Sequence, residues 1–435
     1  ASMIQKDRFI RGVSALLCCL LLLRALPAAA EEPLELASQA AVLLDADTGA
    51  VLYEKNMHQV LYPASITKIM TALLAVQALE PEQILTVSQA AVNAVPRTSS
   101  HISLVPGEQI TAEQALYAIG MESANDAANV LAEAVSGSLE AFAEKMTETA
   151  AALGARNTHF SNANGLPDSN HTTTAYDMAL ITAAAWKQEG LAAYFSTVCY
   201  TFAATNLSDA RDFQNKNRLL AGGQYYYEGV QMAKTGWTSS AQGTFAAVVQ
   251  RGGVTLVAVT LKSPLLEDKY RDTWKLMDYG FSHYSRVTVT GEQVAASQEL
   301  GDFTPVAGQR LSYLIPAGMS MQDIRYTVEL PETVSRQTTR ITADVTATLD
   351  ELTLPQLQLQ LERPPQPRVD FSLAQLLSPS AAIESVPHAL RLPLAIVCLT
   401  LIVLIFIWLH RQIKCHARRR HLKNKIRRMK KKMQP

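Results

Sequence analysis

The sequence contains little cysteine, and its five cysteines cannot pair within one folded region. Cys18 and Cys19 lie in an apolar run near the N-terminus, while Cys398 and Cys415 lie near the C-terminus. Only Cys199 falls in the long region between these ends. An intramolecular disulfide is therefore excluded there, and we expect the folded part to be stabilised by burial of apolar side chains.

Histidine is also sparse, and its nine copies show none of the spacings that are typical of metal ligands. His101, His159 and His171 stand apart from any pair at helical ligand spacing. We therefore predict structural or surface roles for these three side chains. The sequence predicts neither a bound metal nor another cofactor.

No excess of charge exists over the whole chain, which has 39 Lys and Arg against 39 Asp and Glu. The balance hides an asymmetry, because a basic run without acidic residues extends from Arg411 to Lys432 and the chain before it is acidic. This tail, residues 410–435, lacks interleaved aromatic residues and a folded framework. We predict that it sets membrane topology and contacts anionic lipid, and that it does not bind nucleic acid.

Long apolar runs occur only at the two ends. Basic residues precede Val13 to Leu23, and the small residues Ala28 to Ala30 follow, an order that is typical of a secretory signal peptide. We predict a signal peptide over residues 1–30, with a retained membrane anchor as the alternative. Leu392 to Leu409 is an 18-residue apolar segment, about 27 Å long as a helix, and therefore able to span a bilayer.

The basic tail after this segment fixes the expected orientation. Basic flanks stay on the cytoplasmic side, so the tail is predicted to be cytoplasmic and residues 31–391 to lie outside. The predicted location is therefore the cell membrane, with the folded region extracytoplasmic.

Hydrophobic periodicity divides the folded region into two predicted domains. The first, residues 31–284, begins and ends with strands and contains a block of helices, which favours a mixed α/β (α+β) sheet domain with a helical subdomain. The expected strands and helices are 41–45, 50–54, 65–79, 111–119, 125–135, 139–153, 225–232, 244–250, 254–261 and 272–284. The second, residues 285–363, contains short alternating runs that predict a small all-β domain. Residues 364–391 are read as a linker.

A serine and a lysine lie one helical turn apart at the start of the helix predicted from Ser65. On a helix, Ser65 and Lys68 share one face, so the hydroxyl and the amine can meet. A buried lysine whose ammonium form is disfavoured can take the proton of a serine hydroxyl and so activate it as a nucleophile. By itself, however, the motif is more typical of an N-capping serine followed by a solvated lysine.

Two further motifs favour the catalytic interpretation. Ser123-Ala124-Asn125 stands at the start of a predicted helix, and Lys234-Thr235-Gly236 stands on a predicted strand. In this order and spacing the three motifs resemble the penicillin-binding protein and serine β-lactamase superfamily. More narrowly, residues 40–284 resemble a low-molecular-mass D-alanyl-D-alanine carboxypeptidase. Further matching segments are Asp45 to Gly49, Asp126 to Ala128, Thr158 to Asn162, Gly165 with Leu166, and His171 to Asp177.

The resemblance implies a β-lactamase/transpeptidase-like fold, with an antiparallel sheet, flanking helices and a helical subdomain, followed by the β domain. It also implies residue roles. Ser65 is the expected nucleophile, Lys68 its base and Ser123 a proton relay. Asn125 is expected to hold the substrate amide or to orient Lys68. Lys234, Thr235, Gly236 and Trp237 are the expected substrate-binding residues, with backbone amides of Ser65 and Trp237 as the oxyanion hole.

The family resemblance implies a peptidoglycan stem peptide as substrate and β-lactams as covalent inhibitors. Trp237 stands where relatives often have a smaller or polar residue, which puts the substrate contacts beside this strand in doubt. No glutamate between Asp126 and Lys234 begins a Glu-x-x-Leu-Asn motif, so rapid β-lactam hydrolysis is not expected. The alternatives are a DD-endopeptidase or transpeptidase on the same site, and a catalytically degenerate wall-binding protein.

Overall fold

The computed structural model describes residues 34–296, 298–331, 333–335, 338–350, 352–363, 400, 403–405 and 407. The chain divides into two compact units, residues 1–364 and 365–435, and the domains described below belong to the first. The predicted signal peptide, linker and basic tail lie outside the described residues, as does most of the predicted membrane segment 392–409. Within the described residues no helix is long and apolar enough to cross a membrane, so that segment stays a prediction.

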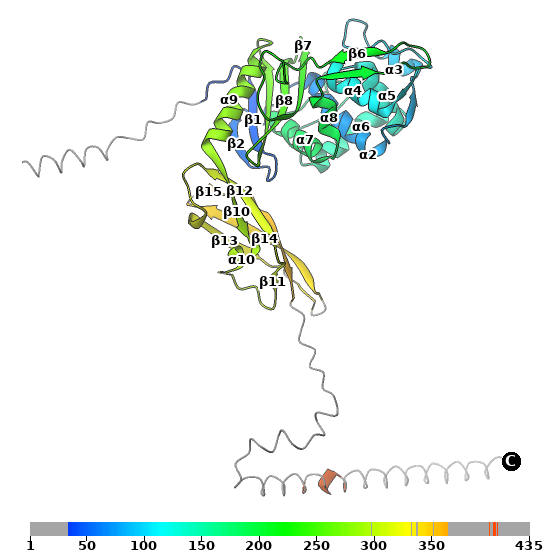
Figure 1. Cartoon of the computed structure of the whole chain (residues 1–435). Helices are drawn as coiled ribbons and strands as arrows, with labels where there is room; N and C mark the ends of the chain where they lie inside the picture. Colours follow the sequence, from blue (N-terminus) through cyan, green and yellow to red (C-terminus); the bar gives the residue numbers. More distant parts are fainter. Residues whose placement is uncertain are drawn as a thin grey trace, which may run out of the picture. The chain divides into compact units, whose positions relative to one another are not determined.

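A five-stranded antiparallel sheet forms the centre of the first domain (Figure 1). Its strands, in spatial order, are β2 (Val51–Lys55), β1 (Ala40–Asp45), β9 (Val254–Ser263), β8 (Gln242–Arg251) and β7 (Val230–Thr238). The central pair joins distant parts of the chain, since Ala40 of β1 is opposite Leu261 of β9. The sheet leaves β7 at one edge, where a ligand can approach its backbone.

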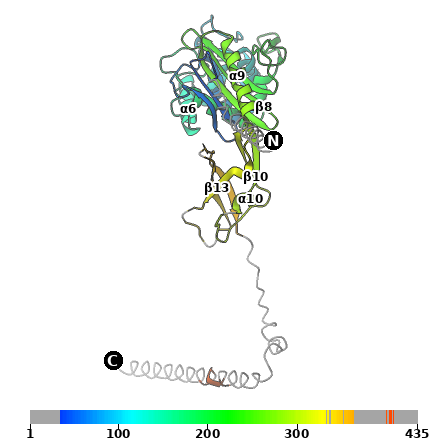
Figure 2. The same ribbon diagram turned by 90° about the vertical axis from the view of Figure 1, so that its left-hand side faces the viewer.

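Both faces of the sheet are covered, because alternate residues of a strand point to opposite sides. Val42 and Leu44 of β1 pack in the core shared with the helical subdomain. Ala41 and Leu43 pack in a second core, formed with the long helix α9 (Asp268–His283). This explains why all six residues of β1 are buried. Figures 1 and 2 show α9 lying along the sheet.

The helical subdomain is an insertion between β2 and β7. Its helices are η1 (Ala64–Thr67), α2 (Lys68–Ala78), α3 (Gln89–Asn93), α4 (Ala112–Tyr117), the π-helical turn η2 (Ala118–Glu122), α5 (Asn125–Ser136), α6 (Leu139–Ala152), α7 (Ala175–Lys187) and α8 (Leu191–Ser196). Two short strand pairs accompany them, β3 (Ile84–Thr86) with β4 (Gln109–Thr111), and β5 (Cys199–Phe202) with β6 (Arg211–Gln214).

The second domain has two small antiparallel sheets around a core of its own. One contains β10 (Tyr284–Thr290) and β12 (Arg310–Pro316). The other contains β11 (Thr304–Pro305), β16 (Leu357–Glu362), β14 (Arg340–Leu349) and β13 (Ile324–Glu329), with β15 (Leu352–Thr353) beside β14. The short helices α10 (Gly291–Ala295) and η3 (Met321–Asp323) connect the strands.

Candidate active site

The Ser65 turn is a short, tightly wound helix start. Ala64 has a φ of +51°, a left-handed conformation that is unfavourable for a residue with a Cβ atom. The chain then passes from η1 into α2, and this brings the Oγ of Ser65 and the Nζ of Lys68 to 3.2 Å from each other. The structure therefore brings this predicted pair together. Local backbone strain of this kind is frequent where a reactive side chain is displayed.

Two fixed acceptors hold the amine of Lys68. Its Nζ donates to Oδ1 of Asn125 at 2.6 Å and to the backbone oxygen of Asn164 at 2.5 Å. A neutral amine has two N–H bonds and one lone pair. When these acceptors take both N–H bonds, the lone pair is left for the hydroxyl of Ser65, which is the arrangement that a general base needs.

The environment of Lys68 favours its neutral form. The side chain is fully buried, and this desolvation lowers the pKa of Lys68 well below its usual value. The positive charge of Lys234 lowers the pKa further, and the carboxylate of Asp126 opposes the shift. Burial therefore favours the form of Lys68 that can accept a proton.

Ser123 lies between the π-helical turn η2 and helix α5. Its φ of +59° places it in the left-handed region, so the chain turns sharply before α5 begins at Asn125. The Nζ of Lys234 donates to the Oγ of Ser123 at 3.0 Å. These residues therefore form two hydrogen-bonded groups: Lys68 with Ser65 and Asn125, and Lys234 with Ser123.

Strand β7 presents its motif to two sides. Lys234 points toward Ser123, whereas the hydroxyl of Thr235 accepts a hydrogen bond from Nζ of Lys269 on α9. Burial lowers the pKa of Lys234 to about 7, and the charges of Lys269 and Lys216 contribute. Near neutral pH, and without a bound anion, Lys234 is therefore only partly protonated.

Gly236 allows β7 to lie directly against the nucleophile turn. A Cβ atom at this position would lie 2.8 Å from the backbone nitrogen of Ser65 and 2.4 Å from Oγ1 of Thr244. A side chain at residue 236 would therefore separate the strand from the amide of Ser65, one of the expected oxyanion donors. Trp237, the next residue, is 58% exposed at the end of the motif.

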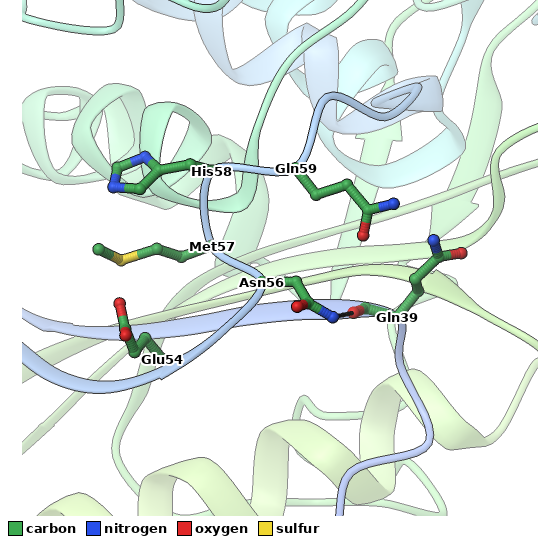
Figure 3. A pocket seen from close by; sticks show the side chains of 6 residues that line it. All are labelled: Gln39, Glu54, Asn56, Met57, His58 and Gln59. Atoms are coloured by element: carbon green, nitrogen blue, oxygen red, sulfur yellow. Dashed lines mark hydrogen bonds between the residues drawn. The ribbon is translucent and has the colours of Figure 1, made fainter.

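A cleft of about 250 Å³ opens beside these groups. It is lined by Ser65, Ser100, Gly120, Met121, Glu122, Ser123, Asn215, Lys216, Asn217, Ala233, Lys234, Thr235, Gly236 and Trp237. A larger, open hollow of about 740 Å³ lies elsewhere (Figure 3) and is lined by Gln39, Glu54, Asn56, Met57, His58 and Gln59. We assign the site to the smaller cleft, because Ser65, Ser123 and Lys234 line it and none of them lines the larger hollow.

Sequence reasoning missed several contributors to this site. Asn164 acts through its backbone oxygen, and no side-chain motif reports that. Lys269 reaches Thr235 from α9, 34 residues along the chain. Lys216 forms an ion pair of 2.5 Å with Glu122 at the cleft. Nothing in the sequence around Asn164, Lys216 or Lys269 separates these residues from ordinary surface residues.

Asp177 and Asn162, which belong to the matching segments of the sequence, form hydrogen bonds within the loops around the site. Asp177 accepts hydrogen bonds from the amide of Asn157 and the hydroxyl of Thr158, and Asn162 accepts one from the amide of Gly165. Asp177 and Asn162 therefore brace the loops around them. His171 is buried beneath the Ser65 turn, in agreement with the structural role predicted for it.

Gly165 offers a direct test of how closely the catalytic turn is held. Gly165 has a φ of +84°, and a Cβ there would lie 2.0 Å from the backbone oxygen of Ala64. We expect Gly165→Ala to displace the turn and to lower β-lactam acylation at least about tenfold, because misplacing reacting groups by about 1 Å is that costly. Acylation rate and melting temperature are the measurements.

Gly154→Ala is the matched control. Gly154 has a similar φ of +89°, but its added Cβ would meet only Leu180 Cδ1 at 3.6 Å. Both variants should lose about 1 kcal/mol from the left-handed backbone, whereas only Gly165→Ala should lose acylation. Equal acylation by the two variants would contradict this account of the turn.

The edge strand lies beside one serine that faces a buried lysine and a second serine that is held by another lysine. Together these groups define an enzyme that acts through a serine nucleophile. The family model for D-alanyl-D-alanine carboxypeptidase matches residues 27–264. The chain therefore belongs to the D-alanyl-D-alanine carboxypeptidase family. This confirms the predicted family and the predicted enzyme class, a serine-type carboxypeptidase.

Individual relatives agree with the family match. The D-alanyl-D-alanine carboxypeptidase DacF of Bacillus subtilis is 32% identical over 340 residues, covering 75% of this chain and 86% of the relative. Penicillin binding protein 5 of Haemophilus influenzae is similar in structure, with a TM-score of 0.64, 25% identity and coverage of 76% and 98%. A DD-transpeptidase of Streptomyces has a TM-score of 0.53 and 28% identity, covering 57% of this chain and 98% of its own. The predicted α/β fold of the catalytic domain is confirmed.

Proposed function

We propose that this chain removes the terminal D-alanine from peptidoglycan stem pentapeptides through an acyl-enzyme on Ser65, and that β-lactams acylate the same oxygen. The observation that carries the proposal is the distance of 3.2 Å between Lys68 Nζ and Ser65 Oγ. The two other hydrogen bonds of the same amine go to Asn125 and Asn164. The family match supplies the substrate class.

The first step is acylation. Lys68 takes the proton of Ser65 as Oγ attacks the carbonyl carbon between the two D-alanines. The developing oxyanion lies against the backbone amides of Ser65 and Trp237. When the C–N bond breaks, Ser123 passes a proton to the leaving amine, and free D-alanine departs. Water then hydrolyses the ester and restores Ser65.

The terminal carboxylate is recognised at β7. Lys234 supplies a positive charge at the cleft, and Thr235 supplies a hydroxyl oriented by Lys269. A buried lysine that binds a carboxylate gains a partner for its charge, so substrate binding favours its protonated form. This preference for a free carboxylate explains why only the last residue is removed.

The pH dependence of substrate capture follows from Lys234. Its pKa of about 7 means that the empty site is cationic below pH 7 and progressively neutral above it. Because a neutral lysine attracts a carboxylate less, we expect kcat/KM to fall by up to about tenfold per pH unit above pH 7. Lys68, which must be neutral, sets the opposite limb at low pH.

Lys234→Arg is the informative variant for this dependence, since arginine stays charged throughout the accessible range. It should retain measurable kcat/KM and lose the fall above pH 7. The measurement is D-alanine release from a D-alanyl-D-alanine peptide between pH 5 and 9. An unchanged alkaline limb in the variant would assign that limb to another group.

A transpeptidase or endopeptidase on the same nucleophile is the second candidate, and it is favoured by the structural similarity to a DD-transpeptidase. Both outcomes share the acyl-enzyme and differ in the acceptor that resolves it. The deciding experiment incubates the full chain with a peptide ending in D-alanyl-D-alanine, with and without an added acceptor amine. Free D-alanine with a shortened peptide supports the carboxypeptidase; an amide product supports the transpeptidase.

We further propose that the enzyme is tethered to the cell membrane by residues 392–409, with the catalytic domain outside and the basic tail in the cytoplasm. The apolar run and the charge asymmetry of the sequence support this topology. A tether of this kind keeps the cleft close to the inner surface of the wall. Protease treatment of intact protoplasts tests it, since the catalytic domain should be cleaved and the tail protected.

A further inference from the structure

The loop from Ser161 to His171, called the 161–171 loop below, contacts the catalytic turn at three points. The backbone oxygen of Asn164 accepts from Lys68, and Gly165 lies directly against Ala64. At the end of the loop, Nε2 of His171 lies 2.8 Å from Oγ1 of Thr67. The loop therefore supplies one of the two acceptors that aim the catalytic lysine.

His171 joins both ends of this arrangement. The side chain is 2% exposed, and its Nδ1 accepts the backbone N–H of Ser161 at 3.0 Å. Since Nδ1 is an acceptor, the neutral ring carries its proton on Nε2 and donates it to Thr67. The imidazole of His171 thus links the two ends of the 161–171 loop and joins the loop to Thr67.

The surroundings keep this ring neutral. Burial lowers the pKa of His171 to about 4, although Asp168 opposes the shift; His159 and Lys68 add to the lowering. Phe160 packs edge-on against the ring, with centroids 5.5 Å apart. At neutral pH the ring therefore has a single hydrogen-bonding pattern, and it is not a candidate for proton transfer.

The 161–171 loop has other anchors of its own. The side chain of Asn164 donates to Oδ1 of Asn129 on α5, and the amide of Gly165 donates to Asn162. These contacts hold the loop near α5 and shape its tip. Neither of them joins the loop to the turn that carries Ser65 and Lys68, which is what the His171 to Thr67 hydrogen bond does.

We propose that His171 is a positioning residue for acylation. Through its hydrogen bond to Thr67, it keeps the carbonyl oxygen of Asn164 within hydrogen-bonding distance of the Lys68 amine. The proposal rests on Ser65 acting as the nucleophile with Lys68 as its base. If the bond to Thr67 is lost, fewer contacts hold the loop against the turn, namely those of Ala163 with Thr71, Asn164 with Lys68 and Gly165 with Ala64. The Asn164 carbonyl, one of the two acceptors of Lys68, is then held less firmly, and the lone pair of Lys68 is aimed less well at Ser65. The penicillin or peptide still binds, but the covalent step slows.

Two substitutions separate the two hydrogen bonds of the ring. His171→Gln places an amide N–H near the position of Nε2, so it keeps the donor to Thr67. His171→Asn places an oxygen near the position of Nδ1, so it keeps the acceptor for Ser161 and loses Thr67. Thr67→Val removes the acceptor while the histidine remains, and this variant tests the same bond if a histidine variant folds poorly.

The experiment measures the acylation rate constant and the non-covalent dissociation constant for a fluorescent penicillin with the full chain, beside each melting temperature. We expect His171→Asn and Thr67→Val to lower the acylation rate constant about 10- to 100-fold with the dissociation constant kept within about threefold. His171→Gln should remain within about threefold of the unmodified chain. The double variant His171→Asn/Thr67→Val should be no slower than the slower single variant.

The proposal is overturned if His171→Asn and His171→Gln acylate equally fast, or if the two single losses multiply in the double variant. It is also overturned if only the melting temperature changes, since this would make the histidine a fold-stabilising residue alone. Failure of the proposed function looks different, because the unmodified chain would then carry no label on Ser65.

Discussion

Ser65→Ala should abolish both D-alanine release and covalent penicillin labelling. The hydroxyl of Ser65 is the group in the cleft that faces the amine of Lys68, and alanine removes the atom that would form the ester. Removing a serine nucleophile from a comparable constellation costs several orders of magnitude, so we expect kcat/KM to fall by at least about 10⁴-fold. Non-covalent binding should survive, because Lys234 and Thr235 remain.

The measurements are D-alanine release, and mass spectrometry of the protein after incubation with penicillin. Ser312→Ala is the matched control, since Ser312 pairs with Thr288 in the second domain and leaves the cleft untouched. A penicillin adduct on Ser65→Ala, or carboxypeptidase activity close to that of the control, would show that another residue is the nucleophile.

Lys68→Arg should have the second largest effect. Arginine is charged at every accessible pH and does not lose its proton, so it cannot accept the hydrogen of Ser65. General base catalysis contributes roughly 10²- to 10⁴-fold, and we expect acylation to fall by about that factor. The loss should persist between pH 6 and 9, because no proton is released within that range.

Lys68→Met accompanies this variant, because a guanidinium at a fully buried position adds strain that methionine avoids. Both variants lack a lone pair at the position of Nζ, so both should acylate slowly even when their melting temperatures differ. Acylation above about one tenth of the normal rate in either variant would mean that Ser65 is deprotonated by another group of the cleft.

Much of the fold was predictable because the elements are strongly periodic. The hairpin of β1 and β2, the helices α5 and α6 and the strands β8 and β9 lie within one to two residues of the predicted ranges. These segments have apolar residues at a clear period of two or of about 3.6. Helix α9 begins four residues earlier than predicted, at Asp268, since its first turn carries charged residues that gave no apolar signal.

The strand predicted from Tyr225 was wrong at its start. Strand β7 begins at Val230, and the preceding tyrosines pack against α9, with Tyr225 stacked on Tyr270 and Tyr227 edge-on to Trp274. Aromatic residues favour strands mainly because they suit half-buried surfaces, and here a loop offers the same environment. Gly229, with a φ of +88°, then turns the chain into the strand.

The site was predictable to the extent that side-chain motifs carry it. The three motifs indicated Ser65, Lys68, Ser123, Asn125 and Lys234, and the structure gathers these side chains. Asn164 acts through a backbone oxygen, and His171 acts through Thr67, so neither role appears as a residue type at a fixed spacing. Helix α7 was likewise not predicted, because it is buried on most sides and its alanine-rich sequence lacks a clear polar face.

The pairing of β1 with β9 has a consequence for biosynthesis. Residues 40–45 meet residues 256–261, so the central strands cannot join until nearly the whole catalytic domain has been synthesised. Closing so long a loop slows folding, because chain entropy is lost before the contacts form. Ser65 is synthesised early, yet β7, the strand that packs against its turn, is only the third of the five sheet strands to be synthesised. A partly made chain therefore has no acylating activity, and penicillin labelling during refolding would report when the sheet closes.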